Sequence, residues 1–211
     1  MAFQTRKSSS SAGHDAAGLI ERRFKESADV LHLLSLDAKA VGVVAAIARE
    51  ISKCLKAGGR VVVFGNGGSA ADAQHFAGEL VGGYTNHNRR ALDVIALSTN
   101  TSNLTAIGND YHYDEVFSRQ VEAHCKKGDI AVGISTSGNS KNVLEAMKVA
   151  KKLRVLTVGF TGASGGKLKD LAQITFQAPS DSTPRIQEAH INAIHSICEL
   201  VEKTLFPNGG K

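Results

Sequence analysis

The sequence has few cysteines and no long apolar run, and both features limit what the protein can be. Cys54, Cys125 and Cys198 are odd in number and far apart, which argues against a disulfide framework or a zinc–thiolate cluster and favours a reducing compartment. No apolar stretch reaches the roughly 18 residues needed to cross a bilayer, and the first residues lack the apolar core of a signal peptide. We therefore expect a cytoplasmic protein with no membrane partner.

A dense cluster of like charge is also missing. The formal net charge is +5, and part of it comes from basic residues near the start of the chain. No basic stripe of the kind that binds nucleic acid is formed, so we expect no nucleic-acid partner and favour a small anionic substrate. With 211 residues, 42% of them hydrophobic, the chain can build one sizeable core. We predict one domain over residues 15–211, preceded by a disordered, Ser-rich tail at residues 1–14.

The periodicity of apolar residues predicts two helices followed by an α/β domain. Three- and four-residue spacing runs through Leu19–Leu36 and Val41–Leu55, so we expect helices in residues 15–57 that pack on the core or on a partner subunit. Short apolar runs then predict buried strands at Arg60–Phe64, Asp93–Ser98, Asp129–Ile134, Val155–Phe160 and Ile174–Ala178. Helical stretches alternate with them at Ser69–Val81, Asp114–His124, Ser140–Lys152, Lys167–Leu171 and Pro184–Leu205.

This alternation predicts a fold class. Strands that alternate with helices form a parallel sheet with right-handed crossovers and helices on both faces. We expect a five-stranded parallel sheet in a flavodoxin-like three-layer α/β sandwich. In such sheets ligands bind beyond the carboxyl ends of the strands, so the loops there are the places to look for a site.

The first strand runs into a glycine-rich loop, Gly65-Asn66-Gly67-Gly68-Ser69. Glycines let the backbone approach a ligand, Ser69 is a suitable helix N-cap, and a helix start offers free N–H groups to an anion. A tight turn with nothing bound is the alternative. A dinucleotide site also matches the glycine spacing, but the second strand does not close on the acidic residue that such a site expects. A P-loop is excluded because no Gly-Lys-Ser/Thr follows.

The third strand runs into a loop rich in hydroxyl groups. Ser135, Thr136, Ser137 and Ser140 lie within six residues that also contain Gly138 and lead into a helix. Such a loop can hold a phosphate without a lysine. An ordinary capped turn is the alternative, although few turns use so many hydroxyls.

Two helices carry candidate proton-transfer or metal-binding groups. His75 and Glu79 are four residues apart and share a helix face, which suits a metal pair, an acid–base pair or a plain surface interaction. On the last helix, spacing favours His190 as the neighbour of Gln187, because His195 lies about 12 Å further along the helix axis. Each of these histidines is as compatible with a structural role as with a catalytic one.

Taken together, several long motifs resemble the sugar isomerase (SIS) domain family and, within it, the phosphoheptose isomerases. The resemblance runs from about Gly18 to Pro207. Its motifs are GNGGSAADAQHFAGE at Gly65–Glu79, LSTNTSNLTAIGNDYHYDEVFSRQV at Leu97–Val121, GISTSGNSKNV at Gly133–Val143, VGFTG at Val158–Gly162 and TPRIQEAHINAIH at Thr183–His195.

The resemblance implies an activity and an assembly. Members of this family convert sedoheptulose 7-phosphate to D-glycero-D-manno-heptose 7-phosphate, the entry to the heptose of lipopolysaccharide and related glycans, as homotetramers with active sites at subunit interfaces. By similarity Glu79 and His195 form the catalytic pair. The implied zinc ligands, for one Zn²⁺ per subunit, are His75, Glu79, Gln187 and His195. The implied substrate-binding residues are Ser135, Thr136, Ser137 and Ser140 for the phosphate, and Asn66, Gly67, Gly68, Ser69, Thr99, Asn100 and Gln187 for the rest of the sugar.

The resemblance also selects His195 over the His190 that helix spacing favours, and we interpret this conflict as a sign that the site is assembled between chains. One departure is visible, because many relatives have Asp where this chain has Asn100. Two alternatives stay in view: a non-catalytic SIS protein of the type that associates with the bacterial replication initiator, which the Glu199–Pro207 stretch resembles, and a regulator that senses a phosphosugar. In the first type the positions of Glu79 and His195 have lost their carboxylate and imidazole, whereas both are present here.

Overall fold

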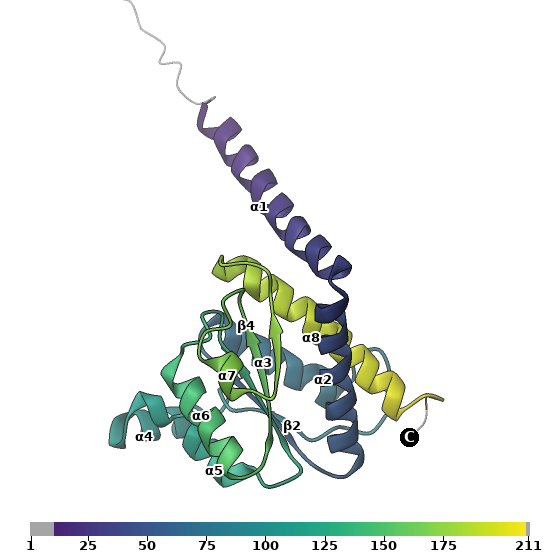
Figure 1. Ribbon diagram of the computed structural model, residues 1–211, viewed down its shortest axis with the longest axis vertical. Coiled ribbons are helices and arrows are strands. Elements are labelled where there is room, and N and C mark those ends of the chain that lie inside the picture. The colour runs from purple at the N-terminus through teal and green to yellow at the C-terminus, as the bar shows by residue number, and fades with distance from the viewer. Residues whose placement is uncertain (1–10, 210–211) are drawn as a thin grey trace, which may run out of the picture.

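A computed structural model describes residues 11–209 (Figure 1). Residues 1–10 of the predicted tail lie outside the described residues. The prediction is wrong for residues 11–14, because they form the first turn of a helix that begins at Ser11. The helices are α1 (Ser11–Leu36), α2 (Ala38–Lys56), α3 (Gly68–Gly82), α4 (Thr101–Asp110), α5 (Ser118–His124), α6 (Lys141–Lys152), α7 (Leu168–Leu171) and α8 (Thr183–Leu205), with a 3-10 turn at Tyr113–Glu115. The strands are β1 (Val61–Gly65), β2 (Val94–Ala96), β3 (Ile130–Ile134), β4 (Leu156–Thr161) and β5 (Ile174–Gln177).

The five strands form one parallel sheet in the order β2-β1-β3-β4-β5. This confirms the predicted five-stranded parallel sheet flanked by helices, and every predicted strand is present with its ends shifted by no more than two residues. All residues of β1 and β3 are buried, as expected for strands covered on both faces. The chain leaves β1 toward β2 on one side and continues through β3 on the other, so the sheet has its switch point between β1 and β3.

Two hydrophobic cores fill the space between the sheet and its helices. Successive side chains of a strand point to opposite faces, so Val61 and Val63 enter one core while Val62 and Phe64 enter the other. The first core contains the buried faces of α2, α3 and α8. The second contains those of α5 and α6 together with Leu168 of α7. Helices α3 and α8 therefore lie on the same face of the sheet, where they pack against each other.

Helix α4 was not among the predicted helices. Its sequence, TSNLTAIGND, consists largely of weak helix formers, and none of its residues is buried, so it has no apolar face for a periodic pattern to reveal. The helix begins at Asn100, whose side-chain oxygen accepts the N–H of Asn103 at 3.0 Å. An N-cap of this kind supplies the local stabilisation that the apolar pattern lacks.

The two N-terminal helices are present where the periodicity predicts them. Asp37 caps α2 by accepting the N–H groups of Lys39 and Ala40 at 2.8 and 3.1 Å. Helix α2 packs on α8 and β5, whereas the N-terminal part of α1 projects from the body of the molecule (Figure 1). Within residues 11–209 no single helix is long and apolar enough to cross a bilayer, and only α1 and α2 taken together, at a bend of 81°, have that length and composition.

Candidate functional site

The loops that follow β1 and β3 lie side by side at the switch point of the sheet. Gly65 at the end of β1 pairs with Ile134 at the end of β3, and a Cβ on Gly65 would come within 2.8 Å of the Ile134 carbonyl oxygen. The side-chain amides of Asn66 and Asn142 exchange two hydrogen bonds, at 2.9 and 2.8 Å. This reciprocal pair ties the glycine-rich loop to α6, the helix that starts in the hydroxyl-rich loop.

The glycine-rich loop departs from prediction at its helix start. Helix α3 begins one residue earlier than expected, with Gly67 as its N-cap at a φ of 55°, a backbone conformation that glycine adopts without strain. Ser69 is therefore not the N-cap; it is buried within the first turn. Gly67 and Gly68 are exposed, so a ligand can approach their backbone.

The hydroxyl-rich loop forms a compact cradle, which we define as Ser135, Thr136, Ser137 and Ser140. The Ser135 Oγ is 3.0 Å from the Ser140 Oγ and 3.5 Å from the Ser137 Oγ. Ser140 is the N-cap of α6, yet its side chain makes no capping hydrogen bond. The N–H groups of Lys141 and Asn142 at the start of α6 consequently remain available to an anion beside three converging hydroxyls, whereas the Val143 N–H donates to the Asn142 side-chain oxygen at 2.9 Å.

The cradle is supported from behind by the loop that follows β4. Gly138 has a φ of 66°, and a Cβ there would clash with the backbone of Gly165 and Gly166. The Leu168 N–H donates to the Gly138 carbonyl oxygen at 2.9 Å, and the Lys167 N–H donates to the Asn139 side chain at 3.2 Å. Two loops from neighbouring strands thus fix the shape of the cradle.

Thr99 and Asn100 lie beyond β2, at the same edge of the sheet, and both are exposed. The Thr99 hydroxyl donates to the Ala96 carbonyl oxygen at 2.9 Å, and Asn100 caps α4. Asn and Asp are about equally good N-caps. The Asn that distinguishes this chain from the relatives noted above therefore keeps the capping role that an Asp would have.

A cluster of three side chains forms where α3 lies against α8. His75 Nε2 is 2.9 Å from Glu79 Oε1 and 3.1 Å from His195 Nε2, and the side chains of His75 and Glu79 are 44% and 26% exposed. We call His75, Glu79 and His195 the His–Glu–His cluster. It forms within one chain, so the separation of Gln187 and His195 along α8 does not require a second subunit to bring His195 to Glu79.

The His–Glu–His cluster has the donor set of a metal site. Its three ligand atoms all lie within 4.8 Å of one another. Each imidazole nitrogen has one hydrogen or one lone pair in the ring plane, so His75 Nε2 cannot direct a good hydrogen bond at both of its neighbours. A cation between the three groups would satisfy all of them, and imidazole with carboxylate suits Zn²⁺.

Gln187 and His190 lie elsewhere. The Gln187 side chain lies against Gly68, since a Cβ on that glycine would come within 2.8 Å of the Gln187 Cδ. Its amide therefore meets the glycine-rich loop rather than His195, which is about 12 Å further along α8. His190 is fully buried, with its Nε2 3.0 Å from the Thr161 carbonyl oxygen and its ring against Phe160 and Phe176. Burial lowers the pKa of His190 to about 4, which keeps the imidazole neutral.

Sequence reasoning missed two residues beside the cluster. Asp72 is one turn before His75 on α3, and burial raises the pKa of its carboxyl to about 6, against a lowering effect of His75. Its buried Oδ2 accepts no hydrogen bond among the described residues. The Tyr84 ring lies 5.8 Å from the His195 ring. The i, i+3 spacing of Asp72 and His75 could have signalled the first, whereas Tyr84 belongs to a loop with no periodicity.

Comparison with known proteins relates the whole domain to one family. Residues 24–162 match the SIS domain model. The chain is 51% identical to the phosphoheptose isomerase of Geobacter sulfurreducens. The match extends over 175 residues, or 83% of this chain and 92% of that protein. It is 57% identical to the probable phosphoheptose isomerase of Thermoplasma acidophilum. That match extends over 157 residues, or 74% of this chain and 86% of that protein.

Solved structures agree with these sequence relatives. The phosphoheptose isomerase from Neisseria gonorrhoeae superposes with a TM-score of 0.82 at 41% identity, over 88% of this chain and 99% of that one. The corresponding protein from Francisella tularensis superposes with a TM-score of 0.84 at 33% identity, over 89% and 98%. Since the SIS domain model covers more than half of the chain and the match to these relatives extends over most of their length, the chain belongs to the phosphoheptose isomerases of the SIS domain family.

Proposed function

We propose that this chain, a sugar-phosphate isomerase by family, interconverts sedoheptulose 7-phosphate and D-glycero-D-manno-heptose 7-phosphate, the first step toward a glycan heptose. The observation that carries the proposal is the His–Glu–His cluster on α3 and α8, because α3 starts in the glycine-rich loop beside the hydroxyl cradle. His75 lies seven positions beyond Gly68, which corresponds to a rise of about 10 Å along α3. A substrate with its phosphate and its carbonyl at opposite ends of a long carbon chain suits such a separation.

The phosphate end is assigned to the hydroxyl cradle. Ser135, Ser137 and Ser140 would donate to phosphate oxygens, with the first N–H groups of α6 as further donors. The sugar hydroxyls would then meet Asn66, Gly67 and Gly68, with Thr99 and Asn100 at the next strand end. The exchange of hydrogen bonds between Asn66 and Asn142 keeps these two parts of the site in a fixed relation.

The chemistry moves a proton between C1 and C2 through an enediol, so it needs a base at carbon and an acid at oxygen. In this proposal Glu79 removes the carbon-bound proton from the open-chain ketose and returns it to the neighbouring carbon. His195 exchanges protons with the two oxygens. His75, in contact with both, orients the carboxylate and the imidazole. Asp72 carries a pKa of about 6, and as a carboxylate near neutral pH it would favour a positive charge on the cluster.

Zn²⁺ is part of the proposal as a cofactor, one per subunit, held by the His–Glu–His cluster. When bound, it would polarise the substrate carbonyl and stabilise negative charge on the sugar oxygens. The Nε2 of His195 cannot bind the ion and carry a proton at the same time, so His195 would exchange protons only while it is not bound to the ion. Glu79 has two carboxylate oxygens, so it could bind the ion with one and accept a proton with the other. Gln187 would reach the same ion only from a neighbouring subunit, since its own amide lies at Gly68.

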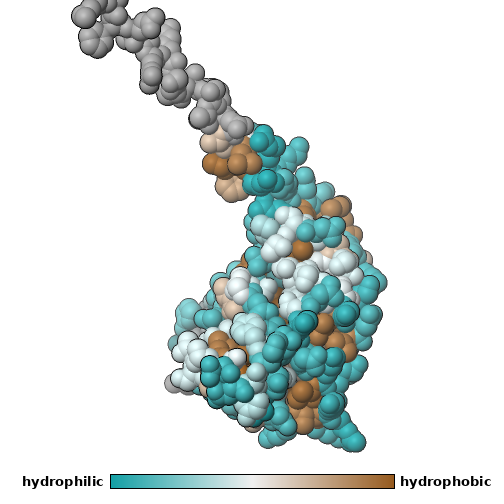
Figure 2. Space-filling view, turned by 90° about the vertical axis from the view of Figure 1, so that its left-hand side faces the viewer, coloured by the Kyte–Doolittle hydropathy of each residue, from teal (hydrophilic) through white to brown (hydrophobic). Residues whose placement is uncertain are grey.

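A homotetramer is proposed as the working form, and apolar side chains on the projecting helix support self-association. Figure 2 shows hydrophobic patches on this helix, and Leu19, Ile20, Phe24, Leu33 and Leu36 of α1 are 45 to 72% exposed. An apolar groove of about 260 Å³ runs between α1, α2 and α8. Exposed apolar side chains next to an apolar groove are typical of an interaction site. A cytoplasmic location belongs to the same proposal and is compatible with three buried, free thiols.

One assay separates this function from its alternatives. Purified protein is incubated with sedoheptulose 7-phosphate in D₂O, with and without Zn²⁺, and the aldose product is followed by NMR. The proposal expects turnover with deuterium incorporated at C2, because a proton held by Glu79 exchanges with solvent. Binding of the ketose without turnover under either condition would identify a phosphosugar sensor, and the absence of both binding and turnover would leave a binding protein of another kind.

A further inference from the structure

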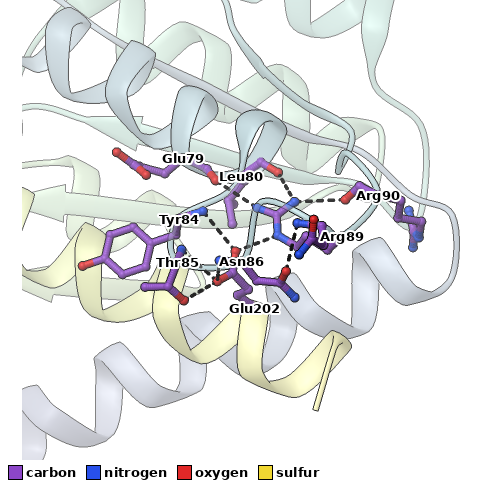
Figure 3. Close-up of polar contacts among 9 residues, drawn as sticks. Glu79, Leu80, Tyr84, Thr85, Asn86, Arg89, Arg90 and Glu202 are labelled. Carbon is purple, nitrogen blue, oxygen red and sulfur yellow. Dashed lines mark hydrogen bonds and ion pairs between the residues drawn. The ribbon is translucent and has the colours of Figure 1, made fainter. Parts of the chain in front are cut away.

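Arg89 lies in the loop between α3 and β2, and its buried guanidinium caps the end of α3 (Figure 3). It donates to the carbonyl oxygens of Leu80 and Glu79, both at 2.9 Å, although its side chain is only 1% exposed. The last carbonyls of a helix attract positive charge, and the Glu79 carbonyl oxygen also accepts the N–H of Gly83 at 3.1 Å. The Glu79 carboxylate points away from Arg89 in Figure 3, so the arginine holds the backbone of this residue and leaves its side chain free for the site.

Glu202 on α8 binds the other side of the same guanidinium. Its carboxylate is 2.7 Å from Arg89 Nε and also accepts the N–H groups of Tyr84, Thr85 and Asn86 at 3.0, 2.9 and 2.7 Å. The Thr85 hydroxyl adds a fifth donor at 2.6 Å. Burial alone would raise the pKa of Glu202, but the hydrogen bonds from Thr85 and Arg89 outweigh it and lower the pKa to about 2. The Glu202 carboxylate is therefore ionised at neutral pH.

These contacts join the two helices that carry the His–Glu–His cluster. Arg89 holds α3 at Glu79, and Glu202 lies seven residues, or about two turns, beyond His195 on α8. Between them the N–H of Tyr84 is fixed by Glu202 while the Tyr84 ring lies beside His195. The ring of Phe206 lies 5.6 Å from the Arg89 guanidinium.

We infer that Arg89 and Glu202 are positioning residues: this buried pair locks the end of α3 to α8 and thereby sets how closely His75 and Glu79 approach His195. The pair does not touch substrate. Its effect is on the geometry of proton transfer and metal binding, in which a displacement of about 1 Å costs up to a hundredfold in rate. The inference rests on the proposed function only for its kinetic test.

The test uses the double variant Arg89→Met/Glu202→Leu in the full chain, because replacing both members of a buried ion pair by apolar residues avoids leaving one charge unpaired. We expect the double variant to fold, with kcat for sedoheptulose 7-phosphate lowered about tenfold to a hundredfold and KM unchanged. The kcat of Arg89→Lys should lie between those of the wild type and the double variant. A lysine ammonium keeps the positive charge next to Glu202, but it lacks the planar, forked guanidinium that reaches both carbonyl oxygens.

A matched control addresses stability. Val121→Ala in α5 removes buried methyl groups from the core on the opposite face of the sheet, so it lowers the melting temperature without touching α3 or α8. Its kcat at 25 °C should equal that of the wild type. If the control and the double variant lose kcat equally, or if neither loses any, the positioning role is overturned.

Two readouts do not depend on turnover. Co²⁺ titration, followed by its visible absorption bands, should give weaker binding and an altered spectrum in the double variant. Crystal structures of the wild type and the double variant should show that the Nε2 atoms of His75 and His195, 3.1 Å apart in this structure, lie further apart in the variant than in the wild type. An unchanged separation overturns the inference even if the wild type proves inactive, whereas an inactive wild type with a displaced cluster in the variant overturns only the proposed function.

Discussion

His75 and His195 are 120 residues apart in the sequence, yet their Nε2 atoms lie 3.1 Å apart. The contact exists because α3 and α8 lie side by side on one face of the sheet, which brings together two histidines that no local pattern connects. It also places two ring nitrogens and a carboxylate around one point, an arrangement that favours a cation.

Removal of one imidazole should weaken metal binding. We expect His75→Asn to lower the affinity for Zn²⁺ by at least about tenfold, because loss of even an outer-shell partner costs that much. The measurement is competition with a chromophoric chelator. His124→Asn, at the end of α5, removes a histidine outside the cluster and should bind zinc like the wild type. Equal affinities for the two variants would contradict a metal site at the cluster.

Substitution of Glu79 by Gln should abolish the proton transfer while preserving the shape of the site. General acid–base catalysis contributes about a hundredfold to ten-thousandfold, so kcat should fall within that range. The KM should change little because the cradle is untouched. Near-normal turnover by Glu79→Gln, measured in the NMR assay, would show that another group is the base.

The role of the Gln187 side chain, which lies against Gly68, can be tested with two glycine-to-alanine substitutions in α3. An added methyl group at Gly68 would overlap the Gln187 side chain, whereas one at Gly78, also in α3, would meet nothing within 4 Å. Both Gly68→Ala and Gly78→Ala should fold, since alanine favours a helix over glycine by about 1 kcal/mol. We expect reduced kcat/KM only for Gly68→Ala, because only there must the Gln187 amide move. Equal kcat/KM for the two variants would mean that the position of Gln187 does not matter.

The cradle should determine phosphate binding rather than catalysis. Ser135→Ala removes the hydroxyl at the centre of the cradle, and a hydrogen bond to a charged group is worth about 1.5–3 kcal/mol. The KM should rise about tenfold to a hundredfold at similar kcat. Ser196→Ala, which removes an exposed hydroxyl bound to the Asn192 carbonyl oxygen, is the control. An unchanged KM for Ser135→Ala would move the phosphate to another part of the site.

His190 should make stability fall as the solution is acidified. The unfolded chain protonates this imidazole near pH 6.5, but the folded protein does so only near pH 4, so the unfolded state binds more protons between these values. The free energy of unfolding should therefore drop by about 3 kcal/mol from pH 6.5 to pH 4 through this residue. In His190→Gln, this part of the pH dependence of urea unfolding should vanish. The same slope in both proteins would assign it to other groups.

Much of the fold could be predicted from the sequence because each buried strand is a short run of β-branched and apolar residues. Helix α4 could not, since none of its residues is buried. In the site, the loops at Gly67 and Ser135 were predictable because strand ends meet at one edge of a parallel sheet. The approach of His195 to Glu79 was not derivable from helix spacing, which only favoured His190 over His195 as the neighbour of Gln187. That spacing measures distance along α8 only, whereas the site depends on how α3 lies against it.

The positive φ of Gly138, together with its close approach to Gly165 and Gly166, has a consequence for how this protein can diverge. The hydroxyl side chains of the cradle can be exchanged one at a time, so affinity for the anionic end of a substrate can drift gradually. Any side chain at Gly138 would instead have to push apart two backbones. New substrate preferences should therefore arise through changes around the sugar, while these glycines resist substitution.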